Sequence, residues 1–314
     1  MTEPRWTRTV CEGFEAWEGR TERLALTVIP ALGGKAISLV NVATGREWLW
    51  RSGKPLGNEG YGSPFANGDE SGWDEMFPGI DACAYPESPW QGRAVPDHGE
   101  VWSQPWRFRP EGATLRGEVE GIHFPYTLEK SISMPAHDTL RMQYAVTNRS
   151  NAPFSFLWAA HPLFCAREGM RIRVPDRLKE IEVSYSAGSR LGAFGDKRSW
   201  PIARSAAGEV DLSIVGPPDG RHAEKYYFTE RVTEGWAALE DPETGEAVVL
   251  RFPADRVPYL AVWANAGGYG GFEHVALEPA TGRMDDLAHA IGRGQEAAVG
   301  PGERYAWHLE LSLR

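Results

Sequence analysis

The sequence has 314 residues, of which 42% are hydrophobic and 24% charged, and its formal net charge is −10. The length allows one large domain or two small ones, and the composition is ordinary for a globular protein. The negative charge and the lack of any basic run exclude nucleic-acid binding, because neutralising phosphates requires clustered lysines and arginines.

The sequence also predicts a cytoplasmic protein that has no membrane segment. No apolar run approaches the roughly 18 residues of a transmembrane helix, and the polar N-terminal stretch carries no apolar signal segment. The three cysteines are odd in number and far apart, which indicates free thiols in a reducing compartment. We expect Cys165 to be a buried, small hydrophobic side chain.

Strand patterns dominate the chain, as apolar residues alternate with polar ones over short segments that end in turns. In chain order they predict a strand at 23–30, a hairpin at 36–50, strands at 126–134, 139–148 and 154–164, a hairpin at 235–252, and strands at 259–265, 274–279 and 304–313. One short helix is predicted at 283–294. With no repeat and no linker, these elements predict one all-β domain over residues 1–314, a large β-sandwich or barrel.

Two irregular segments are candidates for functional loops. Residues 53–105 contain Gly, Pro, Asp and Trp with little periodicity, and long loops of this kind in compact domains are usually functional. The stretch "GGYGGF" at 267–272 joins two strands and opens no helix, so we expect a flexible loop beside the site.

The first of these segments contains an acid-rich stretch, "GDESGWDEMFPGID". Asp74 and Glu75 stand between two aromatic residues and are expected to face a pocket. The other acids of the stretch are expected to be solvated, namely Asp69, Glu70 and Asp81.

Three ionisable residues stand at strand ends or in loops, where a site would form. His161 ends the apolar run "FLWAAHPLF", Glu278 ends another apolar strand, and His98 lies in the loop "PDHG". A histidine can donate a proton near neutral pH and a glutamate can accept one. The alternative is a hydrogen-bonded core histidine and a glutamate that merely begins a turn.

Motifs for other chemistries are missing from the sequence. It has no Walker A loop, Rossmann fingerprint, Gly-x-Ser-x-Gly elbow, His-x-His or His-Glu-x-x-His, and its eight histidines are scattered. We therefore expect no metal, nucleotide or redox cofactor.

The order of several segments resembles the aldose 1-epimerase (galactose mutarotase-like) family over nearly the whole chain. The segments are "VIPALGGKAISLVNVATGREWLW", "PDHG", "FPYTLEKSISM", "LRMQYAVTNRSNAPFSFLWAAHPLF", "VALEPATG" and "VGPGERYAWHLELSL". The resemblance implies a β-sandwich of the supersandwich type with a carbohydrate site on one face. It also implies a small-molecule sugar as the substrate.

Matched residue by residue, the resemblance implies that His161 is the general acid, Glu278 the general base and His98 a substrate-orienting histidine. This pair predicts a rate that falls at low pH as Glu278 is protonated and at high pH as His161 loses its proton. An apolar floor for the sugar is expected from one or more tryptophans among Trp73, Trp102 and Trp263.

The sequence departs from the well-studied members at their sugar-contacting positions. The arginines before and after the His-Gly motif are missing, and Lys225 is only a substitute for their sugar-binding aspartate. The sugar and the oligomeric state therefore stay open, and nothing supports a phosphorylated substrate. Two rivals remain: a non-catalytic sugar-binding or regulatory protein on the same fold, and an accessory domain of a carbohydrate lyase or hydrolase.

Overall fold

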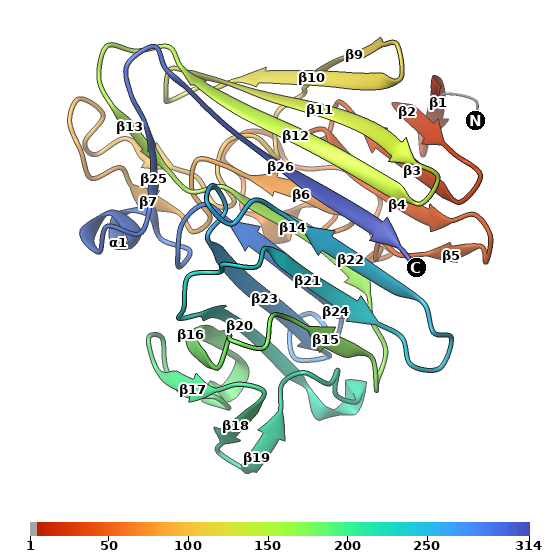
Figure 1. The fold of residues 1–314 in the computed structure, drawn as a ribbon. Helices are drawn as coiled ribbons and strands as arrows, with labels where there is room; N and C mark the ends of the chain where they lie inside the picture. The colour runs from red at the N-terminus through yellow and green to blue at the C-terminus, as the bar shows by residue number, and fades with distance from the viewer. Residues whose placement is uncertain (1–4) are drawn as a thin grey trace.

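The computed structural model describes residues 5–314, and it is built almost entirely from two large antiparallel sheets that lie face to face (Figure 1). The larger sheet has twelve strands, in the order β1 (Trp6–Cys11), β2 (Phe14–Arg20), β3 (Leu24–Ile29), β4 (Lys35–Asn41), β6 (Trp73–Met76), β14 (Ala159–Cys165), β24 (Glu273–Ala280), β23 (Tyr259–Ala266), β20 (His222–Phe228), β16 (Glu180–Ser186) and β17 (Lys197–Ser199), with β5 (Arg46–Glu47) beside β4. The smaller has eight, in the order β15 (Arg171–Arg173), β21 (Trp236–Glu240), β22 (Ala247–Arg251), β26 (Arg304–Leu313), β12 (Thr139–Asn148), β11 (Tyr126–Ala136), β10 (Thr114–Glu120) and β9 (Arg107–Glu111).

The remaining elements are short. Three two-stranded pairs are β13 (Phe154–Phe156) with β25 (Ala297–Val299), β18 (Ile202–Ser205) with β19 (Gly208–Asp211), and β7 (Cys83–Ala84) with β8 (Ala94–Val95). The helices are α1 (Leu287–Gly292) and the 3-10 turns η1 (Phe65–Asn67), η2 (Ala187–Ser189) and η3 (Pro218–Gly220). None of the helices within residues 5–314 has the length and apolar character to span a bilayer.

The predicted all-β sandwich is confirmed, and the predicted strands 139–148 and 304–313 coincide with β12 and β26. The apolar run 154–164 is not one strand. It breaks after Phe156, so that β13 joins a small pair while β14 enters the centre of the large sheet. The helix is shorter than its prediction, 283–294.

The sequence pattern missed β6, which lies inside the irregular span and next to β14. All four of its residues are buried, so the strand shows no alternation of apolar and polar side chains. Cys165 is only half-buried, which corrects the expectation of a core position, although burial still raises the pKa of its thiol to about 11. All three cysteines are free thiols.

An ion pair between the two sheets fixes β6. Lys130 of β11 reaches across the core, and its Nζ lies 3.2 Å from Oε1 of Glu75 and donates to the backbone oxygen of Gly34 at 3.0 Å. Tyr144 OH also donates to Oε1 at 2.8 Å, and Trp158 Nε1 donates to Oε2 at 3.0 Å. Since side chains alternate along a strand, the neighbour Asp74 projects from the opposite face of the large sheet.

We expect Glu75→Gln to lower the free energy of unfolding by about 3–5 kcal/mol, because it leaves the Lys130 ammonium buried without a counter-charge. Urea unfolding followed by tryptophan fluorescence measures this loss. Glu129→Gln is the matched control, because Glu129 precedes Lys130 and its ion pair with Arg304 is exposed. The control should change stability by about 0.5 kcal/mol or less. Equal losses in the two variants would show that the ion pair does not anchor β6.

Candidate functional site

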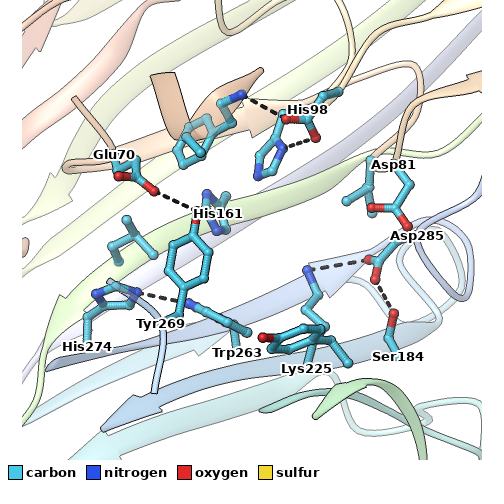
Figure 2. Close-up of a pocket in the computed structure, with 16 residues that line it drawn as sticks. Glu70, Asp81, His98, His161, Ser184, Lys225, Trp263, Tyr269, His274 and Asp285 are labelled. Atoms are coloured by element: carbon cyan, nitrogen blue, oxygen red, sulfur yellow. Dashed lines mark hydrogen bonds and ion pairs between the residues drawn. The ribbon is translucent and has the colours of Figure 1, made fainter. Parts of the chain in front are cut away.

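A cavity of about 370 Å³ opens on the face of the large sheet that points away from the small sheet. This size is within the range of roughly 300–1,000 Å³ that small-molecule sites show. Its floor comes from β14, β20, β23 and β24, and its walls come from β16 and the connecting loops (Figure 2). The lining residues are Phe65, Ala66, Glu70, Ile80, Asp81, Asp97, His98, His161, Leu163, Ser184, Tyr185, Lys225, Trp263, Tyr269, His274 and Asp285.

The strand register brings His161 and Glu278 together. Leu163 of β14 pairs with Ala276 of β24. Because the two strands are antiparallel, His161 and Glu278, each two residues away from that pair, also lie opposite each other and project from the same face. His161 lines the cavity with 6% of its surface exposed. Glu278 has no exposed surface and does not line the cavity, but Lys225, which does line it, contacts Glu278.

Lys225 holds one of the two oxygens of Glu278. Its Nζ donates to Glu278 Oε2 at 2.5 Å and lies 3.4 Å from Asp285 Oδ1. The other oxygen, Glu278 Oε1, is buried and has no hydrogen-bond partner among the described residues. The carboxylate therefore keeps one free acceptor.

Burial dominates the proton affinities on this floor. It lowers the pKa of His161 well below its ordinary value, and the nearby groups His98 and Lys225 lower it further. Burial raises the pKa of Glu278, while the Lys225 ammonium opposes that rise. Burial disfavours the charge on Lys225, but Asp285 and Glu278 outweigh it and raise the pKa of Lys225. His161 is thus neutral at pH 7, and Lys225 is an ammonium.

His98 is held in place by its own loop. Its Nδ1 lies 2.8 Å from Oδ1 of Asp97, and its ring stacks on Phe65 with 4.1 Å between the centroids. Its backbone φ of 57° is unusual for a residue with a side chain, and such strained positions cluster at functional sites. Its ring centroid is 5.3 Å from that of His161, so both imidazoles face the same space.

The glycine after His98 is required by a close backbone approach. Gly99 has φ of 75°, and a Cβ there would lie 2.2 Å from the backbone oxygen of Phe77. Only glycine fits directly after His98. The "PDHG" motif therefore needs its glycine for the loop to hold the imidazole in this position.

One wall of the cavity carries a group of polar residues that the sequence did not indicate. Asp285 Oδ1 accepts a hydrogen bond from Tyr227 OH at 2.7 Å, and Ser184 Oγ donates to Oδ2. Asp81 lies beside it, since the Asp81 backbone N–H donates to the Asp285 backbone oxygen at 2.9 Å (Figure 2). Burial, and then the Asp285 charge, raise the pKa of Asp81 to about 6.

The glycine-rich loop forms the opposite wall, as expected of a loop beside the site. Tyr269 OH donates to Oε1 of Glu70 at 3.0 Å, and the Tyr269 ring meets Trp263 edge-on with 5.8 Å between the centroids. Trp263 Nε1 in turn donates to Nε2 of His274 at 2.9 Å, so Trp263 and Tyr269 give this wall its apolar surface (Figure 2). The side chain of Asn265 fixes the Tyr269 backbone at both its N–H and its oxygen.

Besides Glu278, four of the residues predicted for the site do not line the cavity. Trp73 and Glu75 face the core between the sheets, and Trp102 packs edge-on against Phe65 and donates its Nε1 hydrogen to the Asp97 oxygen. Trp102 therefore supports the loop that carries His98 and is not part of the cavity floor.

The fourth, Asp74, lies opposite His161 in the strand register but is 1% exposed. Lys35 Nζ is 3.4 Å from Asp74 Oδ2 and 2.5 Å from Asp69 Oδ1. Burial, partly offset by Lys35, raises the pKa of Asp74 to about 7.

The expectation for the other acids of this stretch was wrong in two cases. Asp69 and Glu70 are 2% and 6% exposed, and Glu70 lines the cavity. Asp81 is exposed and also lines the cavity. Within residues 5–314, no three His, Cys, Asp or Glu side chains converge as they would to hold a metal ion.

Solved structures show that this fold is the galactose mutarotase-like fold. A galactose mutarotase related enzyme from Lactobacillus acidophilus superposes with a TM-score of 0.70 at 14% identity, covering 95% of this chain and 97% of the other. A galactose mutarotase-like protein from Clostridium acetobutylicum gives 0.68 at 13% identity, covering 100% and 99%. A candidate aldose 1-epimerase from Escherichia coli K12 gives 0.67 at 18% identity, covering 93% and 96%. No protein-family model and no curated protein matches the sequence.

The Asp81 carboxyl should titrate near pH 6, and Asp285→Asn should lower that pKa because it removes the neighbouring negative charge. Carboxyl ¹³C chemical shifts across a pH series measure both values. Asp255→Asn is a control, since Asp255 is exposed and forms its ion pair with the neighbouring Arg256. An unchanged Asp81 titration in Asp285→Asn would mean that burial alone sets this pKa.

Proposed function

We propose that the cavity binds an aldose and interconverts its α and β anomers, with Glu278 as the base and His161 as the proton donor. The observation that supports this most is the position of the two side chains. They come from adjacent strands and project from one face, and His161 shares the cavity with His98. The fold shared with galactose mutarotase-like proteins is consistent with the proposal.

The proposed reaction opens and recloses the sugar ring. Glu278 Oε1 takes the proton of the C1 hydroxyl, and the bond between C1 and the ring oxygen breaks. The neutral His161 ring passes its N–H proton to that oxygen and becomes an imidazolate, which takes the proton back on reclosure. Rotation about C1–C2 turns the carbonyl, and reclosure on the other face reverses both proton transfers. Trp263 supplies an apolar surface for the sugar ring, and His98 orients its hydroxyls.

Lys225 has two effects in this scheme. Its ammonium fixes the carboxylate of Glu278 through Oε2 and leaves Oε1 as the acceptor. It also contacts Glu278 from the cavity lining, so a bound sugar must reach the base beside the lysine side chain. Apo geometry does not exclude a base, since catalytic contacts often form only in the complex.

A second candidate function is sugar binding without catalysis. The burial of Glu278 behind Lys225 favours it, because a base that never contacts the sugar performs no chemistry. Such a protein would use the same cavity and the same aromatic wall.

We expect His161→Ala and Glu278→Gln each to lower kcat for mutarotation by about 10²–10⁴, the usual contribution of one acid or base. Polarimetry of fresh α-anomers from a panel of aldoses measures the rate, and calorimetry measures sugar binding, which should change far less. The matched controls are His137→Ala and Glu273→Gln, both exposed and outside the cavity. A wild-type protein that binds aldoses but accelerates none of them would support the binding function.

The rate should rise with pH as Glu278 ionises, and this rise should lie above pH 4.5 because burial raises the Glu278 pKa from that ordinary value. We expect no fall between pH 7 and 9, in contrast to the sequence-based expectation. His161 is already neutral there, and a neutral imidazole can donate its N–H to a developing oxyanion. A pH series of kcat/KM measures this, because kcat/KM reports the pKa values of the free protein. A rate that falls above pH 7 in the wild type, but not in His161→Ala, would show that the imidazolium is the acid.

A further inference from the structure

The cavity is strongly acidic for a site of its size. Four carboxylates line it and a fifth lies directly behind Lys225; they are Glu70, Asp81, Asp97, Asp285 and Glu278. Lys225 is the only lysine among the lining residues, and none of them is an arginine. Its Nζ contacts both Glu278 and Asp285, so its charge is already matched by two carboxylates.

The other carboxylates differ in how many hydrogen bonds and ion pairs they make. Glu70 is paired with Lys54 at 2.5 Å, and Asp97 contacts His98 and accepts from the Phe65 backbone N–H at 2.7 Å. Asp81 differs from them, because its carboxylate makes no hydrogen bond and no ion pair within the described chain. Its oxygens are therefore available to a ligand in the cavity.

Buried polar atoms without partners, at and beneath the cavity, indicate that the acidic wall belongs to a ligand site. His161 Nδ1 and Glu278 Oε1 are both buried without a hydrogen-bond partner in the part of the chain that the structure describes. Buried polar atoms of this kind are costly and usually have partners. Their occurrence beside the cavity is explained if a polar ligand completes the site.

We infer that the site selects sugars by charge, binding a protonated amino sugar more tightly than the neutral parent sugar and excluding phosphorylated and carboxylated sugars, with Asp81 as the residue that contacts the ammonium group. This inference rests on the proposed sugar site. Unlike charges attract strongly in a partly dehydrated cavity, and an added anion would face several carboxylates with no free cation. A neutral sugar still binds, because carboxylates also accept hydrogen bonds from hydroxyls.

Mutarotation rates of α-D-glucose, α-D-glucosamine, D-glucose 6-phosphate and D-glucuronate test the selection, at a pH where the amine is protonated and after subtraction of the uncatalysed rates. We expect kcat/KM to be about tenfold or more higher for the amino sugar than for glucose, and about tenfold or more lower for the two anions, which corresponds to about 1.4 kcal/mol per decade. A phosphate or carboxylate sugar that equals glucose, or an amino sugar that does not exceed it, overturns the inference.

Asp81→Asn tests the assigned residue, and it should lower the ratio of amino sugar to glucose by about tenfold. Asp255→Asn removes an equal charge from an exposed position outside the cavity and should leave the ratio unchanged. An unchanged ratio in Asp81→Asn overturns the role of Asp81.

Calorimetric Kd values for the same four sugars separate the two proposals. If no sugar is turned over, the proposed reaction fails, but the charge selection is still tested by the order of the Kd values. If the sugars are turned over without this order, the reaction stands and the selection fails.

Discussion

The inter-sheet ion pair between Lys130 and Glu75 is the constraint on which the site depends. A buried charge without a partner is strongly unfavourable, and here Tyr144, Trp158 and Lys130 together satisfy both oxygens of Glu75. This fixes the register and rotation of the four-residue strand β6. Because β6 pairs with β14, the same contacts determine where His161 projects on the far side of the sheet.

The residues of the site come from two parts of the fold, the central strands of the large sheet and the loops around the cavity. The groups that exchange protons in the proposed reaction, His161 and Glu278, come from central strands of a sheet that is packed against a second sheet. The carboxylates Asp81 and Asp285, like Glu70, come from loops. The side chains that exchange protons in the proposed reaction are therefore held most rigidly. The loops supply the carboxylates that would distinguish one ligand from another.

The sequence predicted the strands with clear alternation and several lining residues, among them His98, His161, Lys225 and Trp263. It could not place Trp73 and Glu75, because β6 is buried on both faces and its pattern does not indicate which side chains face the other sheet. Asp81 and Asp285 are 204 positions apart and meet only through the packing of two loops, so neither has a local signal. Glu70 was expected to be solvated because the residues of an acid-rich stretch are usually exposed.

Tyr269 lies in the glycine-rich loop. The two ends of this loop differ in whether their glycines can be replaced by residues with a side chain. At Gly267 a Cβ would lie 2.3 Å from the Pro218 oxygen, and at Gly268 it would lie 2.4 Å from the His222 carbonyl carbon, so the backbone leaves no room for a side chain. At Gly271 a Cβ would meet no atom, and only the positive φ of 73° favours glycine. Divergence in this loop is thus confined to its far half, where the cavity wall can change shape while the floor beneath it is preserved.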